Sequence, residues 1–148
     1  MKTLVSALAL LIGSNVMAVA ADQTLKFKVV AFNAGEKDGG YHFVGAIVSP
    51  DGTIGTKDFF VKEDQNGKGA GPSTYYFPAG SIVTSDSFVD TATQTGGHVV
   101  GKLQIVSGTG AYQGATGTGA FEGDWGDKSP LKNAMLLNIA LDVKTPGT

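Results

Sequence analysis

The sequence contains no cysteine, so it forms no disulfide, thiolate nucleophile or cysteine-based metal site. It also contains no arginine: all 11 basic residues are lysine, which removes the bidentate fork that usually grips carboxylates and phosphates. No segment reaches the ~20 consecutive apolar residues of a membrane-spanning helix, so we expect no membrane span. With a formal net charge of −2 as well, these absences disfavour anionic substrates and nucleic acid as partners.

The first 20 residues have the order of a cleavable export signal. Lys2 supplies a positive start, residues 4–12 form an apolar stretch, and Ala18 and Ala20 are the small residues that a signal peptidase recognises. We therefore predict cleavage after Ala20, a single domain over residues 21–148, and a location in the periplasm or outside the cell. Cleavage leaves ten lysines against 13 acidic residues, a formal charge of −3.

Apolar and polar residues alternate along most of the mature chain. The pattern is clearest in residues 25–29, 98–107 and 135–143, and a period of two is typical of strands with one buried face. Nothing long repeats with the helical period of 3.6. About eight short strands between turn signals predict an all-β fold, and we favour an antiparallel eight-stranded closed barrel, because closure removes exposed sheet edges.

Glycine-rich segments interrupt this pattern. Residues 33–40 are polar and rich in glycine, and we expect them to connect two strands of a hairpin. Residues 63–73 contain three glycines and a proline without apolar periodicity, which predicts an exposed loop. The 22 glycines lack a strict period of three, so they favour turns and tight barrel bends over a collagen-like structure.

The most distinctive passage is residues 105–121, which reads IVSGTGAYQGATGTGAF. It resembles the strand, Gly-Thr-Gly-x-aromatic turn and following strand shared by allene oxide cyclases and plant dirigent proteins, and residues 51–55 and 77–82 resemble hairpins of the same superfamily. The resemblance implies an eight-stranded antiparallel barrel with an apolar lumen, often assembled as a trimer. Members of this superfamily include a cyclase of fatty-acid epoxides and proteins that steer phenoxy-radical coupling.

Two residues are candidates for catalysis. Asp86 shares a strand face with Ile82, Thr84 and Phe88, so inside a barrel its carboxylate would be desolvated and suited to general-acid chemistry. The alternative is a solvated Asp86, since charged side chains are rarely buried without a partner. Tyr112 lies beside the glycine turn and combines an aromatic body with a polar hydroxyl.

Four further residues are candidates for ligand contact: Tyr41, His42, Asp58 and Trp125. Aromatic residues with polar groups either fill a barrel or line its mouth, where they can stack on a ligand. His42 alternates in step with Val44, so it either faces a lumen or sits at the end of its strand. For Asp58, as for Asp86, a buried carboxylate and a solvated one are the two alternatives. The two histidines are far apart in the chain, and no motif predicts a metal or a cofactor.

Three functions remain open. The first is an exported barrel that binds a small apolar or aromatic molecule in its lumen. The second is a cyclase, isomerase or dirigent-like enzyme that acts on an unsaturated or phenolic substrate through the shape of its cavity. The third is a structural or interaction barrel whose own side chains fill the lumen. The sequence thus predicts the fold in more detail than the ligand, because function does not follow from fold.

Overall fold

A computed structural model describes residues 21–147, and the predicted export signal lies outside them. These residues form eight strands and one short 3-10 helix, η1. The strands are long, and most connections are turns of a few residues. Their bounds are β1 Ala21–Lys37, β2 Gly40–Val48, β3 Ile54–Glu63, β4 Lys68–Phe77, β5 Gly80–Ala92, β6 Gly96–Gly108, β7 Thr116–Gly126 and β8 Met135–Thr145, with η1 at Gly110–Tyr112.

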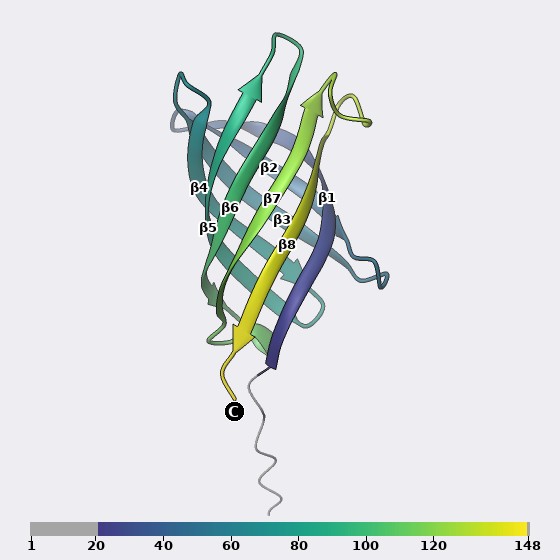
Figure 1. Ribbon diagram of the computed structural model, residues 1–148, viewed down its shortest axis with the longest axis vertical. Helices are drawn as coiled ribbons and strands as arrows, with labels where there is room; N and C mark the ends of the chain where they lie inside the picture. The colour runs from purple at the N-terminus through teal and green to yellow at the C-terminus, as the bar shows by residue number, and fades with distance from the viewer. Residues whose placement is uncertain (1–20, 148) are drawn as a thin grey trace, which may run out of the picture.

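The strands close into one antiparallel barrel, which confirms the expected fold class (Figure 1). Each strand pairs with its neighbours in sequence, and β8 returns to pair with β1 from Ala21↔Thr145 to Ala31↔Met135. The length of β1 makes this closure possible, since its first part pairs with β8 while its second part pairs with β2. No strand edge of the barrel is left open along these ladders.

Alternation decides which side chains point into the barrel, as expected from the sequence. Phe27 and Val29 of β1 are buried, and so are Leu137, Ile139 and Leu141 of β8, while the residues between them face outward. Burial of a large aliphatic or aromatic side chain contributes about 1.5–3 kcal/mol, so this inner face accounts for much of the driving force for folding.

The prediction of a loop over residues 63–73 is wrong, because β4 already begins at Lys68 and the connection is only four residues long. The glycines that suggested a loop are needed because neighbouring strands approach so closely there that a Cβ atom would collide with the adjacent backbone. A Cβ atom at Gly71 would lie 1.8 Å from the backbone oxygen of Phe60. The β3–β4 ladder is interrupted beside Pro72, a residue with no backbone N–H to donate.

The connection expected at residues 33–40 is also shorter than predicted. β1 continues to Lys37 and β2 begins at Gly40, so the turn consists of Asp38 and Gly39. Both turn residues have positive φ, 51° and 74°, as the two-residue turns of twisted hairpins require. The polar composition of this segment reflects exposure of the strand ends and not an irregular loop.

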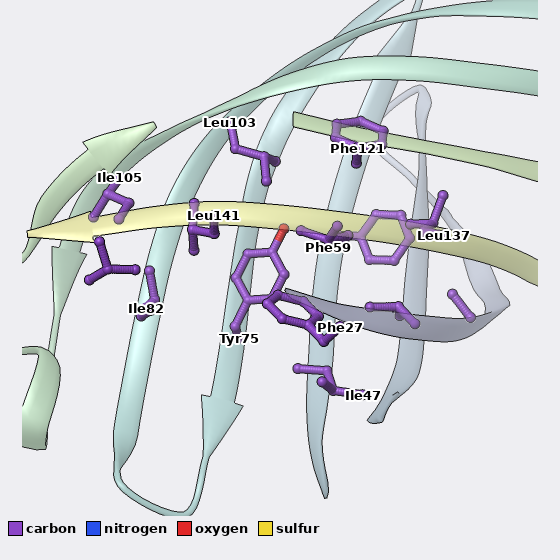
Figure 2. Packing of buried hydrophobic residues seen from close by; sticks show 14 of the residues in the cluster. Phe27, Ile47, Phe59, Tyr75, Ile82, Leu103, Ile105, Phe121, Leu137 and Leu141 are labelled. Atoms are coloured by element: carbon purple, nitrogen blue, oxygen red, sulfur yellow. The ribbon is translucent and has the colours of Figure 1, made fainter. Parts of the chain in front are cut away.

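The interior of the barrel differs between its two ends. Near the chain termini, side chains from opposite walls meet and fill the lumen, as Figure 2 shows for Ile82, Leu103, Ile105 and Leu141. Tyr112 of η1 is buried at this end, where its ring lies 5.8 Å from that of Phe77. The other end of the barrel is not filled.

Candidate functional site

A cavity of about 650 Å³ occupies the unfilled end of the barrel. It lies beneath the turns that join β1 to β2, β3 to β4, β5 to β6 and β7 to β8. Inward-facing residues of these strands form its wall, which is mainly apolar and aromatic: Phe43, Phe59, Val61, Phe88, Phe121 and Leu137. The rings of Phe43 and Phe59 stack at 5.0 Å, so the wall presents a flat aromatic surface.

Lys57 of β3 and Asp86 of β5 also line the cavity, at the level where the packed core begins. Alternation directs both side chains inward, and they are 1% and 3% exposed. Lys57 Nζ lies 3.6 Å from Asp86 Oδ2. A buried ion pair is costly to desolvate and adds little net stability, which makes its presence beside a cavity a sign of function.

Asp86 is held by two buried hydroxyl groups in addition to Lys57. Thr84 Oγ1 donates a hydrogen bond of 2.5 Å to Asp86 Oδ1, and Ser73 Oγ donates a short one to Oδ2. Each of these side chains points inward from β4 or β5. The carboxylate is therefore fixed in place, and its charge is stabilised by two hydroxyl donors and by the nearby Lys57 ammonium.

The Lys57 ammonium is surrounded by aromatic rings. Its Nζ lies 4.2 Å from the centroid of Phe59, 5.0 Å from that of Tyr75 and 5.6 Å from that of Phe121. Ring faces attract a cation, but they accept its N–H groups less well than water does. Burial lowers the pKa of Lys57 to about 8, even though Asp86 acts to raise it.

The Tyr75 hydroxyl is buried close to the Lys57–Asp86 pair, which forms the floor of the cavity. Among the described residues it has no hydrogen-bond partner, and the whole side chain is excluded from solvent. Burial raises the pKa of Tyr75 well above 10, and the negative charge of Asp86 raises it further. Tyr75 therefore keeps its proton at neutral pH, and Figure 2 shows its hydroxyl pointing into the barrel interior.

The mouth of the cavity carries mostly negative charge. Glu63, Asp64 and Asp90 lie around it, and among the described lining residues Lys132 is the basic residue at this level, since Lys57 lies at the floor. Partial burial raises the pKa of Glu63, and the charges of Asp90 and Asp64 raise it further. Trp125 Nε1 donates hydrogen bonds of 2.9 Å and 3.1 Å to the Asp90 carboxylate. This bond fixes the indole ring at the rim.

Three of the predicted site residues lie at this cavity. Asp86 is buried at its floor, as the inward alternative required, and Tyr41 and Trp125 line its wall near the mouth. The catalytic role of Asp86 stays a prediction. Tyr112 is buried at the opposite, filled end, so the structure does not bring Tyr112 and Asp86 together in one site.

His42 and Asp58 lie on the outer wall, so of the alternatives that the sequence left open, neither residue takes the one that faces the lumen. His42 Nε2 and Asp58 Oδ1 are 3.1 Å apart, and the two side chains are 38% and 51% exposed. In β2 the inward residues Phe43 and Ile47 have odd numbers, so His42 points to the opposite, outer face of the strand. β2 and β3 carry apolar residues on both faces, so alternation alone did not show which face was inside.

Lys57 was missed by the sequence analysis. The signal was present, because Lys57 alternates in step with Phe59 and Val61, which are inward residues. However, Asp58 shares its face with Phe60, an equally apolar neighbour. Choosing between two such faces requires knowing which one the neighbouring strands cover.

A second hollow, of about 720 Å³, lies on the outer wall of the barrel over β1, β7 and β8. It is shallower, and the charged side chains that line it, including Lys26 and Glu122, are exposed. The inner cavity is the stronger candidate because it alone of the two contains a buried ion pair. Within residues 21–147, no helix is long and apolar enough to span a membrane, and no cluster of three metal-binding side chains occurs.

No model of a known protein family matches this chain, and neither a curated protein nor a solved structure matches it. The resemblance to allene oxide cyclases and dirigent proteins therefore stays a prediction.

Proposed function

We propose that this barrel binds a small, neutral and mostly apolar or aromatic molecule in its inner cavity. The observation that carries this proposal is an apolar cavity of about 650 Å³ that ends on a buried lysine–aspartate pair. Its volume lies within the roughly 300–1,000 Å³ of ordinary ligand pockets, which are likewise mainly apolar with a few polar groups.

The wall of the cavity favours an aromatic or branched apolar ligand. The stacked rings of Phe43 and Phe59 offer a flat surface, and Phe88 and Phe121 add further rings around the same space. Each Å² of apolar surface that a ligand buries here contributes about 25 cal/mol before the costs of association. A bound aromatic molecule would thus be held mainly by this wall.

The charges favour a neutral ligand. Lys57 and Asp86 neutralise one another at the floor, so an anion entering there would add an unpaired buried charge. The three acidic residues at the mouth also repel anions. A neutral ligand oxygen, in contrast, would accept a hydrogen bond from a free N–H group of the Lys57 ammonium, and the net charge of the floor would not change.

A cyclase or isomerase activity on an unsaturated substrate is a second candidate function. The observation that favours it is the pairing of a fixed carboxylate, Asp86, with a cationic donor, Lys57, at the end of an apolar cavity. Such a pair can polarise a bound substrate while the wall fixes its shape. Turnover of a bound ligand, sensitive to Asp86→Asn, would distinguish this function from binding alone.

We further propose that the domain acts after export, because the first 20 residues have the order of a cleavable export signal. N-terminal sequencing of the protein recovered from cells that express the full sequence tests this point. A mature protein beginning at Ala21 is the expected result.

The binding proposal is tested with two fluorescent probes of the same aromatic body. N-phenyl-1-naphthylamine is neutral, whereas 1-anilinonaphthalene-8-sulfonate carries a negative charge. We expect the neutral probe to bind with at least about tenfold higher affinity, equivalent to about 1.4 kcal/mol. Equal binding of both probes would contradict the charge argument.

Two matched valine variants locate the bound probe. Val61 faces the cavity from β3, and Val44 faces outward from β2 with 42% exposure. Val61→Trp fills the cavity and should abolish binding, whereas Val44→Trp should leave binding unchanged. Far-UV circular dichroism checks that both variants remain folded. Retained binding in folded Val61→Trp would overturn the proposed function.

A further inference from the structure

The amine of Lys57 has an environment that binding alone does not require. We propose that Lys57 forms a reversible imine with an aldehyde or ketone bound in the cavity, with Asp86 as its proton acceptor and counterion. This inference rests on the proposed function, because the carbonyl compound must first enter the cavity. It narrows the ligand class to apolar or aromatic molecules that carry a carbonyl group.

The contacts of Lys57 leave its nitrogen available for reaction. Within residues 21–147, Asp86 is the one acidic side chain within ion-pair distance of Nζ, at 3.6 Å. No acceptor in this part of the chain lies within hydrogen-bond distance of Nζ. The aromatic neighbours of Nζ are the rings of Phe59, Tyr75 and Phe121, and those of Phe59 and Phe121 also line the cavity. A carbonyl carbon held against these rings would therefore lie beside the amine.

The protonation equilibrium of Lys57 also favours reaction. A pKa of about 8 leaves roughly a tenth of the side chains as free amine at pH 7. An ordinary lysine with a pKa of 10.5 is neutral about 300-fold less often at this pH. Buried lysines with lowered pKa values are the usual Schiff-base residues of proteins for this reason.

The reaction balances with the groups present. The Lys57 ammonium gives a proton to the Asp86 carboxylate, and the free amine forms a bond to the carbonyl carbon while the carbonyl π electrons move to oxygen. A second N–H proton then passes to this oxygen, which gives a neutral carbinolamine. The protonated Asp86 returns its proton to the hydroxyl group, water leaves, and the nitrogen lone pair forms the C=N bond.

The product fits the same surroundings as the reactant. One ammonium and one carbonyl give one protonated imine and one water, so the cation and the Asp86 carboxylate still neutralise each other. The hydroxyls of Ser73 and Thr84 continue to hold the carboxylate. The imine cation also keeps the aromatic rings that surrounded the ammonium. No new buried charge has to be stabilised.

The test uses 2-naphthaldehyde with sodium cyanoborohydride, which converts an imine into a stable amine. We incubate the protein expressed from its full sequence with both at neutral pH and map the adduct by peptide mass spectrometry. Adduct at Lys57 should form about 10- to 100-fold faster than at Lys132, an exposed lysine at the mouth of the same cavity. Equal rates at the two residues would overturn the proposal.

Variants and a non-reactive analogue separate the two proposals. Lys57→Arg should lose the fast adduct, whereas Lys132→Arg should retain it, and the adduct map of the unmodified sequence gives the answer even if Lys57→Arg does not fold. 2-Naphthalenemethanol has the same aromatic body without a carbonyl. If it binds in competition with N-phenyl-1-naphthylamine while 2-naphthaldehyde gives no adduct at Lys57, the imine is wrong and the binding function stands. If neither compound binds, both proposals fail.

Discussion

The two ends of the barrel are built from the same alternating strands, but one is filled by side chains and the other contains a cavity. At the end near the chain termini, Ile82 and Leu141 are completely buried, and Tyr112 of η1 covers the lumen. At the other end the inward side chains surround a cavity whose floor is an ion pair. The filled end supplies packing energy that offsets the cost of burying charge, so one half of the barrel stabilises a site in the other half.

Removing the Asp86 carboxylate should give the largest effect on stability. Asp86→Ala leaves Lys57 as an unpaired buried cation, and such changes cost about 3–5 kcal/mol. Asp58→Ala is the matched control, because Asp58 pairs with His42 on the exposed outer wall and should cost less than about 1 kcal/mol. Urea-induced unfolding measures both values.

A double variant sharpens this comparison. Lys57→Met combined with Asp86→Ala removes both charges, so its stability should exceed that of Asp86→Ala alone. If the double variant is instead the less stable of the two, the unpaired charge is not the cause of the loss. A similar loss for Asp58→Ala and Asp86→Ala would also contradict the difference between the inner and outer pairs.

Truncations of apolar residues compare the packing of the two ends directly. Leu141→Ala opens a void in the filled end and should cost about 3 kcal/mol. Met135→Ala in the same strand should cost about 1 kcal/mol, because Met135 is only partly buried and borders a cavity that already exists. Guanidinium unfolding gives both free energies, and equal losses would mean that the cavity is filled in solution.

An effect smaller than that of Leu141→Ala is expected from pH, because the stability should rise as Lys57 loses its proton. The pKa of Lys57 falls from 10.5 in the unfolded chain to about 8 in the fold, so the folded protein binds fewer protons between these values. The free energy of unfolding should therefore increase by about 2 kcal/mol between pH 7 and about pH 9.5. Above pH 10 the raised pKa of Tyr75 acts in the opposite direction, since the unfolded chain loses that proton first.

Lys57→Met provides the reference for this pH dependence. It removes the titrating group, so its stability should change less with pH than that of the unmodified sequence over the same range. Urea unfolding at intervals of one pH unit measures the difference. Parallel curves for the two proteins would show that Lys57 is not responsible for the rise.

The sequence by itself determined the fold class and the inward residues of most strands. Alternation along β1, β6 and β8 correctly placed Phe27, Leu103 and Leu141 inside, and for Asp86 it left a buried and a solvated position open, of which the buried one is observed. It did not decide where both faces of a strand are apolar, as for His42 and Asp58, and it failed where glycines serve a close approach within a sheet, as for Gly71.

The tertiary structure alone decided which inward residues meet. Lys57 and Asp86 lie 29 positions apart on strands that are not neighbours, and the barrel brings them to 3.6 Å. Tyr112 and Asp86 looked equally suited to catalysis in the sequence, yet closure of the barrel places them on opposite sides of its packed core. The physical reason is that alternation is a local property with a period of two residues. Contacts across a lumen depend instead on the register and tilt of all eight strands together.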